Sequence, residues 1–167
     1  LEYVNLVPFY LVKSYLHCIE TLVPQFVHQQ TDLEELFLAR IEDRRTRMLL
    51  KRSLRGSDIE TRHSVCESFF SNELFDDKGR ASTGQRNRVY ARESRILARD
   101  LGKKILDNSP TFSAGDITHV VFASCTGFVN PGPDYHLITD LGLRPNVQRF
   151  VLGFMGCYSG VPALRMA

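Results

Sequence analysis

Two short apolar runs, each ended by glycine or small polar residues, constrain the fold of this chain most strongly. Residues 118–124 read Thr-His-Val-Val-Phe-Ala-Ser, and residues 147–152 read Val-Gln-Arg-Phe-Val-Leu. A short apolar run between turn residues is typical of a strand buried within a parallel sheet. The second run leads directly into a glycine-rich turn at residues 153–160, after which a helix is expected. The pattern predicts an α/β fold.

Further strands and helices are predicted along the rest of the chain. We predict strands at residues 14–21 and 59–65 and a loop at residues 24–30. Helices are predicted at residues 31–54, 82–106 and 134–141, the last ending at Gly142. The first two begin with possible capping boxes, Thr31 with Glu34 and Ser82 with Gln85. This alternation favours one mainly parallel sheet with flanking helices.

Composition excludes several classes of protein. The chain carries 21 Lys and Arg against 19 Asp and Glu, and a net charge of +2 gives no reason to expect nucleic acid as a partner. Its longest apolar run, residues 6–12, is far shorter than the roughly 20 residues of a membrane helix and lacks the basic front of a secretory signal. We therefore expect a cytoplasmic protein without a membrane partner, in which residues 1–13 form an N-terminal arm.

The spacing of the cysteines argues against a zinc site and against a disulfide framework. Cys18, Cys66, Cys125 and Cys157 are scattered and form no C-x-x-C pair. Their spacing predicts neither a zinc site nor a disulfide framework. Each is expected to be a small buried apolar group unless its surroundings indicate chemistry.

Cys157 has such surroundings. It is bracketed by Gly153, Gly156 and Gly160 where a predicted strand passes into a helix. The partial positive charge of a helix N-terminus favours a thiolate over a thiol, and its N–H groups can stabilise an oxyanion on an attacked acyl group. Both effects suit a cysteine that acts as the nucleophile in acyl transfer. A buried structural cysteine beside packing glycines is the alternative. Either interpretation places Cys157 buried at a strand-to-helix junction.

The region around Cys157 closely resembles the type III polyketide synthases, the chalcone and stilbene synthase family. The resemblance spans residues 14–167 and depends on spaced motifs in the right order: Ile-Glu-Thr-Arg-His-Ser-Val at 59–65, Ser-Cys-Thr-Gly-Phe at 124–128, Pro-Gly-Pro-Asp at 131–134, Leu-Gly-Leu-Arg-Pro at 141–145 and Gly-Phe-Met-Gly-Cys at 153–157. The last motif is similar to the bacterial branch. The resemblance implies a thiolase-like fold, of which residues 14–167 form the N-terminal half of a truncated chain, with the C-terminal half absent.

The resemblance also implies the chemistry. Cys157 would accept a starter acyl group from an acyl-CoA, and malonyl-CoA would be decarboxylated and condensed with it, giving pyrone or phenolic products after cyclisation. The family's catalytic His and Asn lie in the second half, so we expect His17, His28, His63, His119 and His136 to be structural or surface residues. No cofactor or metal is implied beyond coenzyme A thioesters as substrates, and a homodimer is expected.

Other residues carry over from the family one by one. Cys125 and Thr126 match positions that line the pocket, although Cys125 could equally be a small buried side chain. Asn130 matches the family position whose side chain reaches into the partner subunit's pocket, which is a Met in plant members. Met155 would pack under the site. Arg52, with Lys51 and Arg55 beside it, would bind the phosphates of coenzyme A, the alternative being a solvated basic face.

Two other functions remain open from the sequence. One is a condensing enzyme of the ketoacyl synthase III type, which also uses a cysteine but with a different surrounding sequence. The other is a non-catalytic, truncated half-domain. Because the catalytic partners implied by the resemblance lie in the second half, we expect the 167-residue chain to be inactive by itself.

Overall fold

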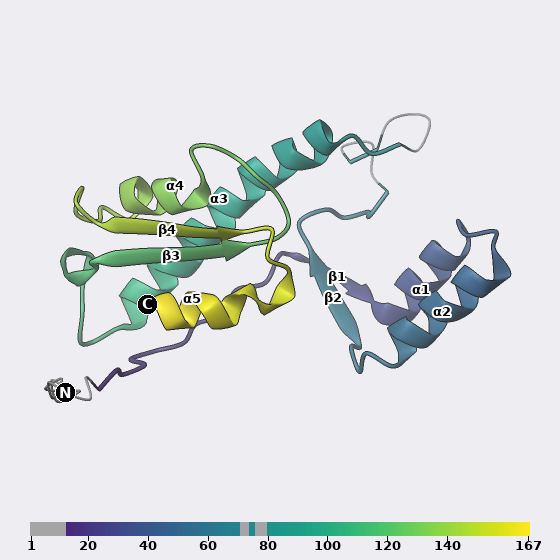
Figure 1. The fold of residues 1–167 in the computed structure, drawn as a ribbon, viewed down its shortest axis with the longest axis horizontal. Coiled ribbons are helices and arrows are strands. Elements are labelled where there is room, and N and C mark those ends of the chain that lie inside the picture. The colour runs from purple at the N-terminus through teal and green to yellow at the C-terminus, as the bar shows by residue number, and fades with distance from the viewer. Residues whose placement is uncertain (1–12, 71–73, 76–79) are drawn as a thin grey trace, which may run out of the picture.

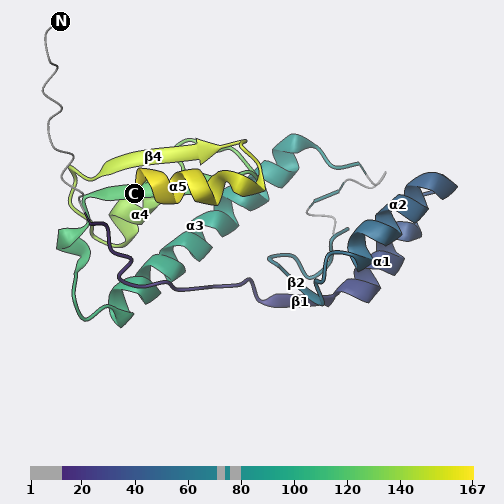
Figure 2. The same cartoon turned by 60° about the horizontal axis from the view of Figure 1, so that its bottom comes forward.

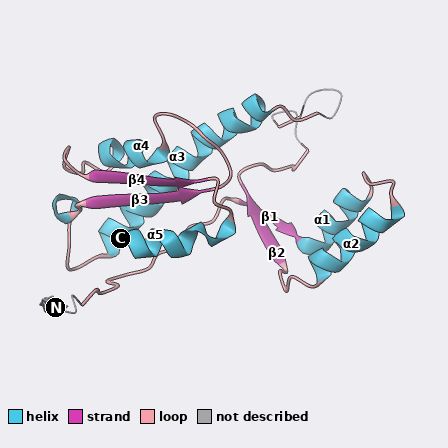
Figure 3. Cartoon of the chain, viewed as in Figure 1, coloured by secondary structure: helices cyan, strands magenta, loops and turns pink. Residues whose placement is uncertain are grey.

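The computed structural model describes residues 13–70, 74–75 and 80–167. The predicted N-terminal arm, residues 1–13, lies outside this part of the chain except for Lys13. Figures 1 and 3 show two lobes, each built on its own pair of strands. The first, the β1–β2 lobe, contains β1 (Phe26–Gln29), α1 (Gln30–Leu38), α2 (Arg44–Arg55) and β2 (Thr61–Ser64). The second, the β3–β4 lobe, contains α3 (Thr83–Asn108), the 3₁₀ turn η1 (Ala114–Asp116), β3 (His119–Ser124), α4 (Pro133–Asp140), β4 (Gln148–Gly153), the 3₁₀ turn η2 (Cys157–Ser159) and α5 (Gly160–Met166).

The two apolar runs form the parallel pair predicted from the sequence. β3 and β4 run parallel in a register that pairs His119 with Gln148 and Ser124 with Gly153. α4 contacts both strands and α3, and α5 contacts β3 (Figure 2). Leu143 and Val147, in the segment that leads into β4, are buried. The α/β prediction is therefore confirmed for this lobe.

The other strand pair departs from the predicted parallel sheet. β1 and β2 are antiparallel, with Phe26 opposite Ser64 and Gln29 opposite Thr61. β1 falls within residues 24–30, where the sequence analysis expected a loop, and the predicted strand at 14–21 is wrong. Residues 14–21 run without regular structure, and α3 holds them through Lys104, whose Nζ lies 2.9 Å from Glu20 Oε2 and donates to the Thr21 carbonyl. Residues 14–21 are thus held by a side chain of α3 and not by pairing with a strand.

The single helix predicted at 31–54 is divided into α1 and α2. Asp43 caps α2, since its carboxylate accepts a hydrogen bond from the Thr46 amide at 2.6 Å. The Arg47 guanidinium binds the Leu38 and Ile41 carbonyls across the break. The capping box expected from Thr31 and Glu34 is wrong, because α1 begins at Gln30 with Gln29 as its N-cap.

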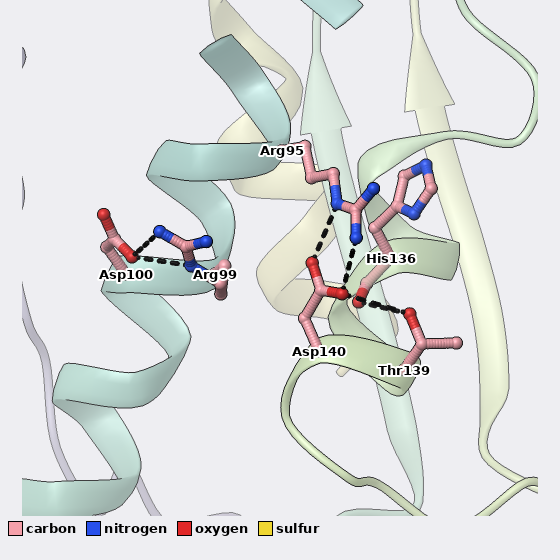
Figure 4. A network of polar contacts seen from close by, with 6 residues as sticks. All are labelled: Arg95, Arg99, Asp100, His136, Thr139 and Asp140. Carbon is pink, nitrogen blue, oxygen red and sulfur yellow. Dashed lines mark hydrogen bonds and ion pairs between the residues drawn. The ribbon is translucent and has the colours of Figure 1, made fainter. Parts of the chain in front are cut away.

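α3 begins as predicted and organises the β3–β4 lobe. Ser82 and Gln85 form the capping box, with the Gln85 amide donating to Ser82 Oγ at 3.0 Å and the Ser82 amide donating to Gln85 Oε1 at 3.2 Å. Farther along, Arg95 donates to both carboxylate oxygens of Asp140 at 2.9 and 2.8 Å, which ties α3 to the end of α4 (Figure 4). The hydrogen bonds from Arg95 lower the pKa of Asp140.

No helix among the described residues is long and apolar enough to cross a membrane. In the same part of the chain, no group of three or more His, Cys, Asp or Glu side chains is placed to hold a metal ion.

Candidate active site

Cys157 lies at the junction between a strand and a helical turn, as predicted. β4 ends at Gly153, residues 154–156 reverse the chain, and Cys157 opens η2, which continues into α5. We call residues 154–159 the Cys157 turn. Gly156 has φ 81° and ψ −172°, a conformation open essentially to glycine alone. The Ser159 amide donates to the Gly156 carbonyl at 3.2 Å, which closes the turn.

The expectation that Cys157 is buried is wrong for this structure. Its side chain is exposed, and its neighbours Phe154 and Tyr158 are 71% and 61% exposed. The reason is that no described segment covers the Cys157 side chain itself, although the neighbouring Phe154 contacts Phe128. Ser159, by contrast, is buried, so the turn is anchored on its inner side while its thiol faces outward.

The parallel register brings a second segment to the same edge. Because Ser124 pairs with Gly153, the residues that follow β3 and β4 leave the sheet side by side. We call residues 125–132 the β3–α4 loop. The rings of Phe128 in this loop and Phe154 in the Cys157 turn lie 5.7 Å apart at their centroids. The two candidate segments are thus in direct contact.

The structure places the candidate pocket residues around this edge. Cys125 and Thr126 directly follow β3, and both are exposed, so the alternative of a buried Cys125 is wrong. Met155 is half-buried within the Cys157 turn. Asn130 is exposed in the β3–α4 loop and precedes a cis peptide bond to Pro131.

An open cavity of about 800 Å³ lies beside the β3–α4 loop. Thr126, Phe128 and Phe154 contribute to one wall, and Asn87, Tyr90 and Leu97 of α3 to another. Cys157 is not among its lining residues. Asn87 also hydrogen bonds the backbone of Phe128. Sequence reasoning missed Asn87, since a lone asparagine on a predicted helix carries no signal of its partner 41 residues away.

The basic candidates lie in the other lobe. Lys51, Arg52 and Arg55 are on α2, whereas the Cys157 turn joins β4 to α5, and Figures 1 and 2 show these segments in different lobes. Arg55 forms an ion pair with Glu34 of α1, Nη2 to Oε1 at 2.9 Å. Its hydrogen bonds lower the pKa of Glu34 and raise the pKa of Arg55. Arg55 is therefore engaged within the protein, while Lys51 and Arg52 are exposed.

The hydrogen bonds and ring contacts of the five histidines are with residues outside the Cys157 turn, although His63 lines the same cavity as Phe154. The ring of His63 contacts the Pro24 carbonyl at 3.1 Å and that of His28 the Cys66 carbonyl at 3.4 Å. The other three lie against aromatic rings, His17 on Phe112, His119 on Phe150 and His136 on Tyr135.

Comparison with known proteins agrees with this arrangement. The family model for the N-terminal domain of chalcone and stilbene synthases matches residues 12–167. The alpha-pyrone synthesis polyketide synthase-like Pks18 of Mycobacterium tuberculosis is 31% identical over 153 residues, which cover 89% of this chain and 38% of the relative. The 1,3,6,8-tetrahydroxynaphthalene synthase of Streptomyces coelicolor is 28% identical over 147 residues, covering 87% of this chain and 37% of the relative.

Solved structures agree on the fold. The crystal structure of the Streptomyces coelicolor tetrahydroxynaphthalene synthase matches with a TM-score of 0.72 and 25% identity, over 86% of this chain and 39% of that one. PKS-I of the brown alga Ectocarpus siliculosus matches with a TM-score of 0.72 and 23% identity, over 87% and 40%. This is the N-terminal half of the thiolase-like fold, and the chain spans about two fifths of the length of these relatives. The chain belongs to the chalcone and stilbene synthase family, as its N-terminal domain.

Proposed function

We propose that this chain supplies the nucleophile and part of the substrate site of a type III polyketide synthase. The observation that carries the proposal is the position of Cys157, at the end of a parallel strand and directly after a glycine with φ 81°. This geometry presents a thiol at the start of a helical segment, which suits a nucleophile in acyl transfer. The family membership supports this chemistry.

The proposed reaction has a loading step and an extension step. The Cys157 thiolate attacks the carbonyl carbon of an acyl-CoA, and the thiolate of coenzyme A leaves and takes up a proton. Malonyl-CoA then loses carbon dioxide, and the resulting enolate carbon attacks the Cys157 thioester. A carbon–carbon bond forms, the bond from the carbonyl carbon to Sγ breaks, and a β-ketoacyl-CoA leaves. Repeated extension followed by cyclisation gives a pyrone or a phenolic ring.

The remaining roles are part of the same proposal. The catalytic His and Asn implied by the resemblance lie outside this sequence, so we expect the 167-residue chain alone to be inactive. Cys125, Thr126, Asn130 and Met155 would line the pocket. A homodimer would complete it, because the β3–α4 loop matches the family segment that reaches the partner subunit.

The contacts of the basic side chains support one assignment within the proposed site for coenzyme A. The side chain of Arg52 makes no ion pair or hydrogen bond with the described residues, whereas that of Arg55 is bound by Glu34. An unengaged guanidinium on an exposed helix face is free to bind a phosphate. We therefore assign the phosphates to Arg52, assisted by Lys51, and give Arg55 a structural role.

The test uses the full-length protein, acyl-CoA starters and malonyl-CoA, with no carrier protein. We expect pyrone or phenolic products, and an acyl group on the peptide that contains Cys157 when malonyl-CoA is withheld. Cys157→Ala should abolish both, and Cys18→Ala, the same change at a half-buried cysteine, should preserve both. Turnover by Cys157→Ala would overturn the proposal. A requirement for carrier protein would favour the ketoacyl synthase III alternative, and inactivity with every starter would favour a non-catalytic half-domain.

A further inference from the structure

The side chain of Asn87 pairs with both backbone polar groups of one residue in the β3–α4 loop. The Phe128 amide donates to Asn87 Oδ1 at 2.8 Å, and Asn87 Nδ2 donates to the Phe128 carbonyl. Loop residues have no strand neighbour to satisfy these groups, so they need another partner. Asn87, in the second turn of α3, therefore holds Phe128 as a neighbouring strand would.

A second contact presses the same loop against α3. Gly127 lies so close to Tyr90 that a Cβ atom at position 127 would overlap the ring carbons Cγ and Cδ1. Tyr90 is three residues after Asn87, so both side chains lie on the same side of α3. The loop is thus fixed to the helix at two adjacent residues, one through hydrogen bonds and one through close packing.

The fixed loop in turn contacts the Cys157 turn. The Phe128 ring lies 5.7 Å from the Phe154 ring at an interplanar angle of 36°. Phe154 has φ 56°, a conformation that costs a bulky residue free energy and persists only where contacts hold it. It is three residues before Cys157. The Phe128 ring, backed by Asn87, is such a contact.

We propose that Asn87 is a positioning residue for Cys157, acting through Phe128 and Phe154. Without the Asn87 amide, the backbone of Phe128 is free to shift, its ring withdraws from Phe154, and the turn relaxes from its left-handed conformation. The thiol then leaves the geometry that attack on a thioester requires. This inference rests on the proposed function for its kinetic consequence, but its geometric consequence concerns the thiol alone.

The test compares Asn87→Ala with Asn108→Ala in the full-length protein. Asn108 is also on α3, but its amide binds Glu20, at the opposite end of the helix from the loop. We expect Asn87→Ala to lower kcat about tenfold or more, since small displacements of reacting groups have large effects, and to leave the KM for malonyl-CoA within about twofold. The rate of Cys157 alkylation by iodoacetamide, followed by mass spectrometry of its peptide, should also change. Asn108→Ala should alter neither kcat nor the alkylation rate of Cys157.

A second variant tests the route from Asn87 to Cys157. Phe128→Ala removes the ring, which is 65% exposed, without removing the backbone groups that Asn87 binds. We expect it to lower kcat too, and the double variant to be no slower than Asn87→Ala, because coupled residues are not additive. If Asn87→Ala does not fold, Phe128→Ala alone decides whether the ring contact affects kcat and alkylation.

The outcomes separate this inference from the proposed function. A lower Tm with unchanged kcat and unchanged Cys157 alkylation in Asn87→Ala would overturn the inference and leave the proposed function standing. Fully additive effects of the two substitutions would overturn the route through Phe128. If the wild-type protein makes no product, the proposed function fails, and the alkylation rates still decide whether Asn87 positions the thiol.

Discussion

Arg55 at the end of α2 donates to both carboxylate oxygens of Glu34 in α1, from Nη2 to Oε1 at 2.9 Å and from Nε to Oε2 at 3.0 Å. The side chain of Glu34 is only 10% exposed whereas that of Arg55 is 65% exposed, so the pair joins the two helices at the edge of the protein surface. Paired, two-point geometry of this kind is the most specific that a guanidinium and a carboxylate form. The basic helix α2 therefore contains arginines of two kinds: Arg55 is held by Glu34, whereas the side chain of Arg52 makes no ion pair or hydrogen bond with the described residues.

The first prediction separates these two arginines. Arg52→Ala should raise the KM for coenzyme A thioesters about tenfold, the loss expected for one charged hydrogen bond, and should leave Tm unchanged. Arg55→Ala should instead lower Tm, because Glu34 loses its partner, and should change the KM little. Steady-state kinetics and differential scanning calorimetry on both variants provide the measurement. A larger KM effect at Arg55 than at Arg52 would contradict the assignment.

The second prediction concerns acid stability and Asp140. The hydrogen bonds from Arg95 hold the pKa of Asp140 below its ordinary value, so the folded state binds this proton more weakly than the unfolded state. The stability from the pair is therefore complete above the ordinary carboxyl pKa of about 3.9 and is lost as the pH falls through the lower, folded-state pKa. Urea midpoints between pH 7 and pH 2 should fall less steeply with acid in Asp140→Asn.

Asp107→Asn is the matched control for this measurement. Asp107 faces Lys103 at 3.3 Å in an exposed i,i+4 pair on the same helix as Arg95, and such pairs contribute little. Its pH profile should follow the wild type. Equal changes in the two profiles would show that the Arg95–Asp140 pair does not supply the acid dependence.

Local sequence patterns were sufficient to predict those features whose structure depends on residues near them in the sequence. The Ser82–Gln85 capping box, the strands β3 and β4 and the junction at Cys157 all follow from patterns a few residues long, and the structure has each of them. The resemblance to a known family extended these patterns to the thiolase-like fold. The same patterns could not show that Cys157 is exposed, because burial depends on which segments pack over the turn.

Long-range partners decided the features that sequence reasoning missed. Gln30 is buried because its amide donates to the Leu54 carbonyl and accepts from Arg62, which draws residues 26–29 into a strand beside β2. Glu34 binds Arg55, 21 residues away, instead of capping its own helix. Each partner is itself an ordinary polar residue in the sequence, so only the folded arrangement identifies the pairs.

The third prediction concerns the close approach of the β3–α4 loop to α3. Gly127→Ala should destabilise the full-length protein by about 1–3 kcal/mol, the usual cost of overpacking, because the added methyl group overlaps the Tyr90 ring. Gly160→Ala is the control, since an added Cβ there meets nothing within 4 Å and the residue has helical φ −60°. Chemical denaturation should show a loss for the first variant and no loss for the second. Equal stability would contradict the tight packing.

The last prediction isolates backbone conformation at the Cys157 turn. An added Cβ meets nothing within 4 Å at Gly153 or at Gly156, so steric overlap does not distinguish the two positions. They differ in backbone conformation, because Gly156 has φ 81° and ψ −172°, whereas Gly153 is the last residue of β4. Alanine at 156 must therefore either hold a conformation that costs about 1–3 kcal/mol or relax and move the adjacent Cys157.

Both alternatives give a measurable result in the full-length protein. If Gly156→Ala keeps the turn, its Tm falls and the alkylation rate of Cys157 is preserved. If the turn relaxes, Tm changes less, and the alkylation rate and kcat change together. Gly153→Ala should match the wild type in all three measurements, since a strand accepts alanine at little cost. A Gly156→Ala protein with wild-type Tm, alkylation rate and kcat would show that the left-handed glycine is not what places the thiol at the start of the helical turn.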